Sequence, residues 1–386
     1  MKLGFYYHIP AYKKEDGKIY LPGFLGVFID SMAKEVNHLY CFMHQPQQPE
    51  LNEEDYVIKS TNVTLVELGS KTPAYIRMLF PSRYKKVFQK YGKFCDNIIV
   101  RSPSPLAPFI YTFLKNETNV VYLIVGDYTN GIKYLNLPPF RKLGIRWFLM
   151  YYQYLQNKVI SKCKVLVNSQ QLFDENKNIA KEIHQIRTTS LSMQNFYYQE
   201  DRCQSSPFQL LYSGRLDFAK GLMEIVEALR ILAEEGIDVI FNLVGWEEGG
   251  KESVKKSLLD KARKLGVESK LIFHGKKPLG LELYAIYQKA DIFVIPSYHE
   301  GFPRVIWEAM ANSLPVIATA VGSIPFFLKH EENSILIQPK SPEEIFEAVY
   351  KIIQDVDLRK KLIKNGLSLA KMNTLEKQTK FLIDKL

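Results

Sequence analysis

The chain has 386 residues, of which 46% are hydrophobic, and carries a formal net charge of +10. It is too long for one ordinary domain and too apolar for a disordered chain, so two domains of near-equal size are expected. The four cysteines lie far apart without C-x-x-C spacing, and no run of about 18 apolar residues occurs. These features indicate neither a zinc knuckle, a disulfide framework nor a spanning helix, and they favour the cytoplasm.

Short apolar runs alternate with longer amphipathic segments along the whole chain, which is typical of an α/β protein. The first run, at 3–7, has the composition of a strand and lacks the cleavage site of a signal peptide. Twelve strands are predicted, at 3–7, 38–43, 63–68, 97–100, 120–125 and 165–168 in the first half and at 209–212, 239–244, 271–273, 292–295, 315–318 and 335–337 in the second. Because helix-sized segments separate them, each half is expected to form a doubly wound sheet.

A polar stretch at 199–207 ends in Pro207 directly before a predicted strand. Polar segments that end in proline are common between domains. We therefore place the linker there, with a first domain at 1–200 and a second at 201–374.

The positive charge is concentrated in the first half. Residues 1–200 contain 25 Lys and Arg against 16 Asp and Glu, whereas the rest of the chain is nearly balanced. Segments 75–93 and 137–155 interleave these cations with aromatic and aliphatic side chains, as a helix lying on an anionic membrane surface does. The same pattern also fits helices that pack their rings inward and solvate a basic face. Single-stranded nucleic acid is a weaker alternative, because no RNA-binding signature is present.

Two cations follow the first strand of the second half. This strand leads into Ser213-Gly214-Arg215 and then Lys220-Gly221, before a helix predicted at 222–234. Ligands bind at the carboxyl ends of parallel strands, and Arg and Lys together suit a diphosphate. Taken alone, this R-x(4)-K spacing is more typical of two ordinary solvated loop residues.

Two carboxylates follow the strand at 292–295. Glu300 lies on a loop, and Glu308 lies on the helix that is predicted to begin near Pro303. The backbone amides of residues 301–304 would be unpaired at the helix start and open to phosphate or sugar oxygens. The alternative is that Glu300 is a partner of the helix dipole and Glu308 is a surface charge.

In combination, R-x(4)-K and E-x(7)-E with their flanking residues resemble the family 4 retaining glycosyltransferases of the GT-B fold. Further matching segments are Val244-Gly245, Phe273-His274-Gly275, Ala290-Asp291, Pro296-Ser297 and Leu314–Thr319. The resemblance implies two doubly wound, Rossmann-like domains facing each other across a cleft, with a C-terminal helix at 375–386 crossing back to the first domain. Domain closure would then complete the site.

The resemblance also implies an activity: a metal-independent, retaining hexosyltransferase that uses a nucleotide-diphosphate sugar, UDP- or GDP-linked, and no cofactor. The acceptor would be a saccharide or a lipid-linked molecule in cell-surface polysaccharide, lipopolysaccharide or glycolipid assembly. The enzyme would then be peripheral on the cytoplasmic face of the membrane and bind no nucleic acid.

By motif position, the resemblance assigns Arg215 and Lys220 to the donor diphosphate and Glu308 to the ribose hydroxyls. Glu300, with the amides of Gly301 and Phe302, would bind the hydroxyls of the donor sugar. The remaining implied donor-site residues are Gly214, Gly245, His274 and Pro303, of which Gly245 and His274 belong to loops that would flank the base.

The first half departs from the family pattern. Gly23 and Gly26 stand where relatives have a glycine-rich phosphate loop, although this spacing alone is a weak signal. Many relatives carry a histidine at the end of a later strand, where this chain has Asp127. Asp127 is therefore the candidate for the acceptor side, or else a turn or N-cap aspartate. Arg101 is a second candidate, or else a charge at a strand end.

No metal site is predicted, because the seven histidines show no ligand spacing and Asp355-Val-Asp357 lies in a charged helical region away from any strand. Two other classes of function stay open. One is a nucleotide-sugar epimerase or hydrolase on the same scaffold, and the other is a non-catalytic, membrane-associated scaffold. Nucleoside diphosphate release that depends on an acceptor distinguishes the transferase from both.

Overall fold

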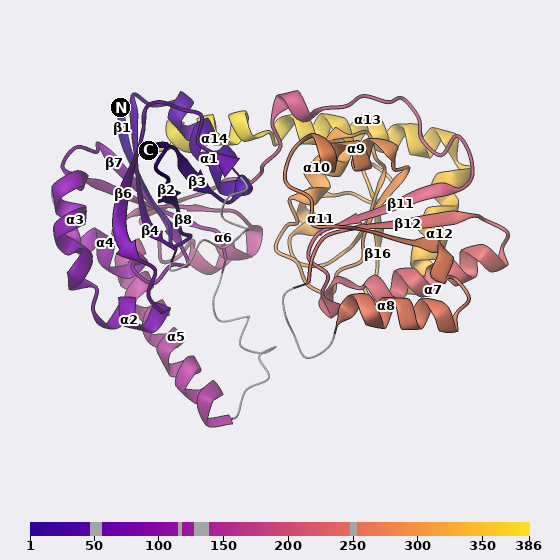
Figure 1. Cartoon of the computed structure of the whole chain (residues 1–386), viewed down its shortest axis with the longest axis horizontal. Coiled ribbons are helices and arrows are strands. Elements are labelled where there is room, and N and C mark those ends of the chain that lie inside the picture. Colours follow the sequence, from indigo (N-terminus) through magenta and orange to yellow (C-terminus); the bar gives the residue numbers. More distant parts are fainter. Residues whose placement is uncertain (47–55, 115–117, 127–138, 248–252) are drawn as a thin grey trace. The chain divides into compact units, whose positions relative to one another are not determined.

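The computed structural model describes residues 1–46, 56–114, 118–126, 139–247 and 253–386. Their contacts divide the chain into two units, drawn in Figure 1. The first unit contains residues 1–188 and 376–386, and the second contains residues 189–375.

A seven-stranded parallel sheet forms the centre of the first unit, in the order β10-β9-β8-β7-β1-β4-β6. The strands are β1 (Lys2–Tyr6), β4 (His38–Gln45), β6 (Val63–Ser70), β7 (Asn97–Ser102), β8 (Asn119–Ile124), β9 (Lys164–Val167) and β10 (Glu182–Gln185). The order reverses between β1 and β7, which is where doubly wound sheets bind ligands. All six predicted strands are confirmed, and β10 was missed because this edge strand is polar rather than apolar.

A small antiparallel sheet of β2 (Tyr12–Lys13), β3 (Ile19–Leu21) and β5 (Tyr56–Val57) also belongs to the first unit. It was not predicted, because strands of two or three residues are too short to show a period of two.

Helices cover both faces of the first sheet. They are α1 (Gly23–Lys34), α2 (Ala74–Leu79), α3 (Ser82–Gly92), α4 (Ala107–Phe113), α5 (Pro139–Ile160), α6 (Gln170–Asn176) and α14 (Leu375–Asp384). Successive strand residues point to opposite faces, so Phe5 packs edge-on against Phe28 of α1, and Tyr6 packs against Phe88 of α3.

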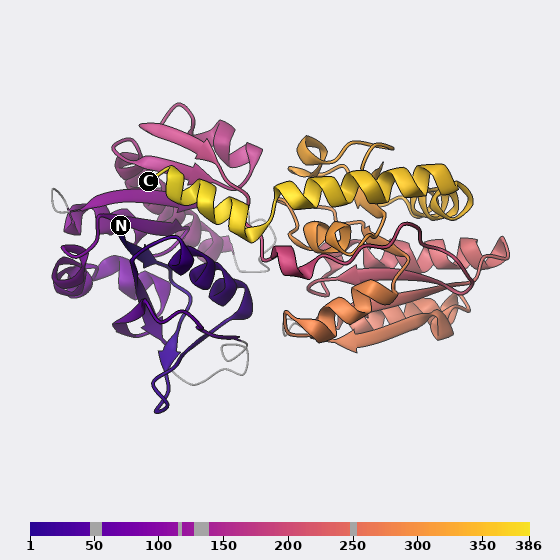
Figure 2. The ribbon, with the colours of Figure 1, turned by 90° about the horizontal axis from the view of Figure 1, so that it is seen from above.

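The last helix packs on the first unit. Ser31 of α1 donates a hydrogen bond to Thr379 of α14 at 2.9 Å, and the amide of Arg187 donates to Gln378 at 2.8 Å. Figures 1 and 2 show α14 beside α1. The 187 residues 189–375 thus separate α14 in sequence from the rest of the unit on which it packs.

The second unit contains a six-stranded parallel sheet in the order β13-β12-β11-β14-β15-β16. The strands are β11 (Phe208–Ser213), β12 (Val239–Val244), β13 (Leu271–Gly275), β14 (Ile292–Ile295), β15 (Val316–Thr319) and β16 (Ile335–Ile337). These are the six predicted strands at nearly the same bounds, since continuous apolar runs are typical of strands buried on both faces. Here the order reverses between β11 and β14.

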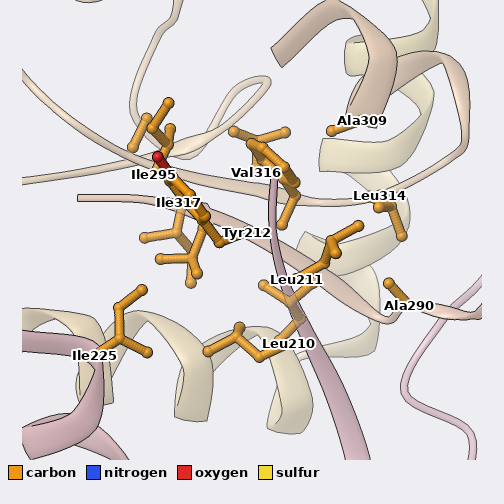
Figure 3. Packing of buried hydrophobic residues seen from close by; sticks show 14 of the residues in the cluster. Leu210, Leu211, Tyr212, Ile225, Ala290, Ile295, Ala309, Leu314, Val316 and Ile317 are labelled. Carbon is orange, nitrogen blue, oxygen red and sulfur yellow. The ribbon is translucent and has the colours of Figure 1, made fainter. Parts of the chain in front are cut away.

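Helices α7 (Leu222–Glu234), α8 (Val254–Lys264) and α12 (Pro342–Gln354) lie on one side of this sheet in Figure 1. On the other side lie α9 (Leu281–Lys289), α10 (Val305–Ala311) and α13 (Val356–Met372), and α11 (Ile324–Phe327) is a single turn. Figure 3 shows the core around β11, where Leu210 and Tyr212 lie among Ile225 of α7 and Ile295 and Ile317 of the neighbouring strands.

The division between the units at 188/189 corrects the predicted boundary at 200/201. Leu191 is fully buried in the core of the second unit. Arg202, 2% exposed, donates to the carbonyl oxygens of Gln288, Ala290, Asn312 and Ser313. Arg202 of the predicted linker therefore bonds to the backbone of the second unit. The polar stretch at 199–207 is part of that unit and is not a flexible linker between domains.

Candidate functional site

The loop after β11 is shaped by a glycine and a capped turn. Asp217 accepts a hydrogen bond from the amide of Ala219 at 2.9 Å and so starts the short helix η4 (Phe218–Lys220). Gly221 then turns the chain into α7 with a φ of 66°. A β-carbon on Gly221 would lie 2.0 Å from the carbonyl oxygen of Pro296, so only glycine permits this approach to the loop after β14.

Backbone and hydroxyl hydrogen bonds hold the two loops together. The amide of Tyr298 donates to the carbonyl oxygen of Ala219 at 2.8 Å. Thr319 of β15, fully buried, donates to the carbonyl oxygen of Ser297 at 2.6 Å. The residues that follow β11 and β14 are therefore fixed relative to each other at the point where the strand order reverses.

Lys220 and Glu300 form an ion pair across these two loops. Lys220 Nζ lies 2.6 Å from Glu300 Oε1, and the side chains are only 21% and 11% exposed. Ser297 Oγ donates to the same carboxylate oxygen at 2.8 Å. The structure thus brings together two of the residues singled out from the sequence, at the carboxyl edge of adjacent strands.

Arg215 lies on the more open side of the same loop. Its Nη2 atom is 3.2 Å from Asp217 Oδ2, with side-chain exposures of 41% and 37%. Its carbonyl oxygen accepts a hydrogen bond from the Tyr212 hydroxyl at 2.8 Å. Burial, followed by the nearby Glu300 carboxylate, raises the pKa of Tyr212.

Glu308 is buried instead of lying on the surface. It is 5% exposed, and its two carboxylate oxygens accept hydrogen bonds from Ser190 at 2.9 Å and from Tyr287 at 3.3 Å. Burial, and then the charge of Glu308, raise the pKa of Tyr287. The surface-charge alternative for Glu308 is therefore wrong. Sequence analysis missed Ser190 and Tyr287, since neither belongs to a recognisable local pattern.

The loop between the two glutamates is anchored inward. The Phe302 ring stacks on Trp307 with centroids 4.4 Å apart and meets Phe327 edge-on at 4.9 Å. The carbonyl oxygen of Gly301 accepts from the amide of Ser323 at 2.9 Å. Pro303 belongs to the turn before α10, which begins at Val305, two residues beyond Pro303 and close to the expected start.

Gly245 brings the loop after β12 against the loop after β11. A β-carbon there would lie 1.8 Å from the carbonyl oxygen of Gly214, so both predicted glycines are at a close backbone contact. Trp246 follows with 43% exposure, and Lys276 Nζ lies 5.6 Å from its ring centroid. An exposed aromatic ring thus stands between the loops after β12 and β13.

His274 contacts Asn242 of β12. Its Nε2 atom lies 2.9 Å from Asn242 Oδ1, and burial, followed by Lys277, lowers the pKa of the imidazole. The ring lines a cavity of about 540 Å³. The other lining residues are Gln209, Asn242, Lys277, Glu282, Ala285, Ile286, Lys289 and Ala290. Gln209 and Ala290 mark the amino ends of β11 and β14, the edge opposite to Glu300.

Three of the four candidate residues of the first unit, Gly23, Gly26 and Arg101, lie within the described residues. Gly23 begins α1, and the amide of Gly26 donates to the carbonyl oxygen of Pro22 at 3.0 Å within that helix. A β-carbon on Gly26 would lie 2.2 Å from the Tyr56 ring, so this glycine has a packing reason of its own. Arg101 lies 4.6 Å over the Tyr7 ring. Asp127 lies outside the described residues.

Over the ranges that the structure covers, no group of three or more His, Cys, Asp or Glu is placed to hold a metal ion. In the same ranges, no helix has the length and apolarity needed to cross a bilayer. Asp355 of the D-x-D segment caps α13, accepting from the amide of Leu358 at 2.9 Å.

Comparison with known proteins assigns the second unit. Residues 195–368 match the family described as glycosyl transferases group 1. The second unit belongs to this family. The match contains Arg215, Lys220, Glu300 and Glu308, so the ion pair lies inside the group 1 domain.

Two curated relatives extend this assignment. An uncharacterized glycosyltransferase of Methanocaldococcus jannaschii is 32% identical over 169 residues, which are 44% of this chain and 40% of the archaeal protein. More than half of that relative is therefore unmatched. The capsular polysaccharide biosynthesis glycosyltransferase CapM of Staphylococcus aureus is 24% identical over 288 residues, which cover 69% of this chain and 70% of CapM.

The whole chain is similar in fold to the Anabaena protein HepE, solved in complex with UDP and glucose. The TM-score is 0.72 at 19% sequence identity, and the likeness covers 100% of both chains. It shows the fold alone: this chain, with its group 1 domain and its two Rossmann-like sheets, has the GT-B fold.

Proposed function

We propose that the chain transfers a sugar from a nucleotide-diphosphate sugar to a saccharide or lipid-linked acceptor. The observation that carries this proposal is the Lys220–Glu300 ion pair of 2.6 Å at the strand-order reversal of the group 1 domain. A cation for phosphate and a carboxylate for sugar hydroxyls stand side by side there, on loops fixed by Gly221 and Thr319.

Lys220 and Arg215 bind the donor diphosphate in this proposal. An ammonium group has three donor hydrogens, so Lys220 can hold Glu300 and a phosphate oxygen at the same time. Arg215 has a partly exposed ion pair with Asp217, and such a pair is worth little and can be exchanged for phosphate. Both cations then stabilise the negative charge that develops on the leaving diphosphate.

Glu300 binds hydroxyls of the donor sugar. Within the described residues, Glu300 accepts hydrogen bonds from Lys220 and Ser297, both on its Oε1 atom. Its Oε2 atom is then the acceptor for a sugar hydroxyl. Glu308 binds the ribose hydroxyls if the Ser190 hydroxyl yields its place on the carboxylate, since both oxygens are occupied in this structure.

We propose retention of the anomeric configuration, on the resemblance to family 4. The bond from the anomeric carbon to the β-phosphate oxygen breaks, and a bond from that carbon to the acceptor oxygen forms on the same face. The acceptor proton passes to the departing phosphate oxygen. These reaction steps need no side-chain base and no metal ion, and they conserve both atoms and charge.

A membrane surface is the proposed location of the acceptor. On α5, Leu143, Trp147, Met150 and Tyr154 are 56%, 65%, 54% and 62% exposed. Their spacing of three and four residues puts them on one helix face, and α5 contains Arg and Lys but no Asp or Glu. An apolar stripe on a helix whose charged residues are all basic suits the surface of an anionic bilayer on the cytoplasmic side. CapM, named for capsular polysaccharide biosynthesis, supports an acceptor in surface polysaccharide assembly.

The test is a panel of nucleotide sugars with and without a membrane lipid extract, read as nucleoside diphosphate release. A UDP-sugar is the first donor to use, because HepE was solved with UDP. Release that requires the extract supports a transferase. Donor consumption without any acceptor contradicts it in favour of a hydrolase or epimerase, and no consumption with any donor leaves the scaffold alternative.

A further inference from the structure

A second cluster of basic side chains lies in the first unit, at the carboxyl edge of its sheet. Arg101 is in β7, His8 follows β1, His44 is in β4 and Lys71 follows β6. These four strands are neighbours in the order β7-β1-β4-β6, which includes the reversal between β7 and β1. Arg77 comes from α2, the helix that follows β6. We call these five residues the basic edge cluster.

The members of the basic edge cluster lie close enough to interact. The positive charges of Arg77, Lys71 and Arg101 each lower the pKa of His8, with burial as the larger cause. Arg77 and Lys71 act in the same way on His44, again after burial. The amide of Lys71 donates to the carbonyl oxygen of Gln45 at 2.8 Å, which fixes the end of β6 beside the end of β4.

Arg77 is buried with two of its three guanidinium nitrogens unpartnered among the described residues. It is 4% exposed, and its Nε and Nη1 atoms have no hydrogen-bond partner among the residues that the structure describes. His8 Nδ1 and Thr72 Oγ1 are buried and unpartnered in the same part of the unit. A buried charge without a partner is costly, so a guanidinium held in this state needs a reason.

A buried acid of the same unit, Asp30, has other partners. Asp30 of α1 accepts from the Tyr56 hydroxyl at 2.7 Å and from the amides of Lys59 and Ser60. Over the described ranges, no ion pair links Lys71 or Arg77 to a carboxylate. The cluster therefore combines several donor groups with an excess of positive charge.

We propose that the basic edge cluster binds an oxyanionic group of the acceptor, a phosphate or a carboxylate, with Arg77 as its central contact. The guanidinium matches two oxygens of such a group in bidentate geometry. The N–H groups of neutral His8 and His44 and the hydroxyl of Thr72 supply further donors, and Lys71 adds charge. The assignment of this anion to the acceptor rests on the proposed function. The presence of an anion site does not.

The donor diphosphate is the competing occupant. The group 1 domain already offers Arg215 and Lys220 for it, on loops of a different sheet. The chain thus has a cationic site at the strand-order reversal of each sheet, which suits a diphosphate donor and a separate anionic acceptor. The experiment must therefore separate anion binding at Arg77 from nucleotide binding at Lys220.

The test measures the unfolding midpoint and calorimetric binding of the full chain with three probes at constant ionic strength: inorganic phosphate, acetate and UDP. The variants are Arg77→Met, which keeps the side-chain volume nearly unchanged, and Lys220→Met. Arg83→Met on α3 is the matched control, because Arg83 is exposed and loses the same charge. Lys71→Met is a milder change at the same cluster.

In the Lys220→Met background, phosphate or acetate should still bind, and adding Arg77→Met should weaken that binding by at least about tenfold. Whichever of the two probes binds more tightly identifies the group. Arg83→Met should change nothing, and Lys71→Met should weaken binding in the same direction. Without any anion, Arg77→Met should unfold at the wild-type temperature or above it, because an unpaired buried charge has been removed.

Anion binding that Arg77→Met leaves unchanged overturns the proposal. So does an Arg77→Met protein that is less stable or unfolded without anion, since Arg77 then has a structural partner in the chain. Loss of UDP binding in Arg77→Met assigns the cluster to the donor and also overturns it. Wild-type UDP binding in Lys220→Met would instead contradict the proposed function and leave the anion site standing.

Discussion

Gly322 lies directly against the carbonyl oxygen of Glu300: a β-carbon at position 322 would be 1.7 Å from that oxygen. With a φ of 56°, Gly322 also holds a backbone conformation that side chains disfavour. The loop that carries Glu300 is thus seated on a glycine of the β15–α11 connection.

Gly322→Ala should displace Glu300 and weaken donor binding as well as the fold. The φ cost alone is about 1 kcal/mol, and the backbone contact adds to it. Thermal unfolding and UDP titration measure both effects. Gly236→Ala is the matched control, because Gly236 has a φ of 74° but nothing within 4 Å of its β-carbon. If the two variants lose the same stability and neither loses UDP affinity, Gly322 does not support Glu300.

Acidification should destabilise the first unit through two buried histidines. Burial, with Arg77, lowers the pKa of His8 to about 3 and of His44 to about 4, and Lys71 and Arg101 act in the same direction on His8. Above the unfolded value of about 6.5 both states are neutral and stability is constant. Below it the unfolded state binds more protons, so stability falls, by roughly 2 kcal/mol per histidine at pH 5.

Denaturant unfolding between pH 7 and pH 5 measures this slope. His8→Gln and His44→Gln should each flatten it, whereas His330→Gln, at a histidine with a 53% exposed side chain, should not. An unchanged slope in both buried-site variants would show that these imidazoles do not stay neutral in the fold.

The sequence predicts the ion pair's position better than it predicts its neighbours. Lys220 and Glu300 each follow an apolar run, and such runs pair as parallel strands with their carboxyl ends at one edge, so their proximity follows from local pattern and fold class. Ser190 and Arg77 were not predictable in this way. Ser190 contacts Glu308 from 118 positions away. Arg77 lies in a segment interpreted as a solvated or membrane-facing basic helix, yet it is 4% exposed, because no periodicity distinguishes a buried cation from its exposed neighbours.

Glu308 should bind a hydroxyl of the donor ribose. Glu308→Gln should weaken UDP binding, and a cycle with 2′-deoxy-UDP tests the contact itself. Wild-type protein should prefer UDP by about tenfold, the value of a hydrogen bond to a charged group, and Glu308→Gln should lose most of that preference. A variant that discriminates as wild type does would remove Glu308 from the ribose.

Ser190→Ala should show how far Glu308 contributes to the stability of the fold and how far to UDP binding. The buried carboxylate loses one of its two donors, so the free energy of unfolding should fall by about 1–3 kcal/mol. Saturating UDP should restore part of this loss, because a ribose hydroxyl takes the vacated oxygen. Equal UDP-induced shifts of the unfolding midpoint in variant and wild type would argue against that exchange.

The exposed face of α5 should bind anionic vesicles. Replacing Trp147 and Tyr154 with Ser should each weaken co-sedimentation with vesicles that contain an anionic lipid by about tenfold, and higher salt should weaken the wild type. Tyr350→Ser on α12 removes a 45% exposed ring from the other unit and should have no effect. Binding that depends neither on anionic lipid nor on salt would contradict a surface role for this basic helix.

The Lys220–Glu300 pair is the centre of the account, and the rate of nucleoside diphosphate release by Lys220→Ala tests it most directly. The measurement uses the donor and acceptor extract that give wild-type turnover, with Lys264→Ala, an exposed lysine of α8, as the control. A folded Lys220→Ala protein should be slower by about 100-fold or more, the effect of removing one group that stabilises the developing charge, while the control keeps its rate. Wild-type release by Lys220→Ala would show that this lysine does not hold the donor diphosphate.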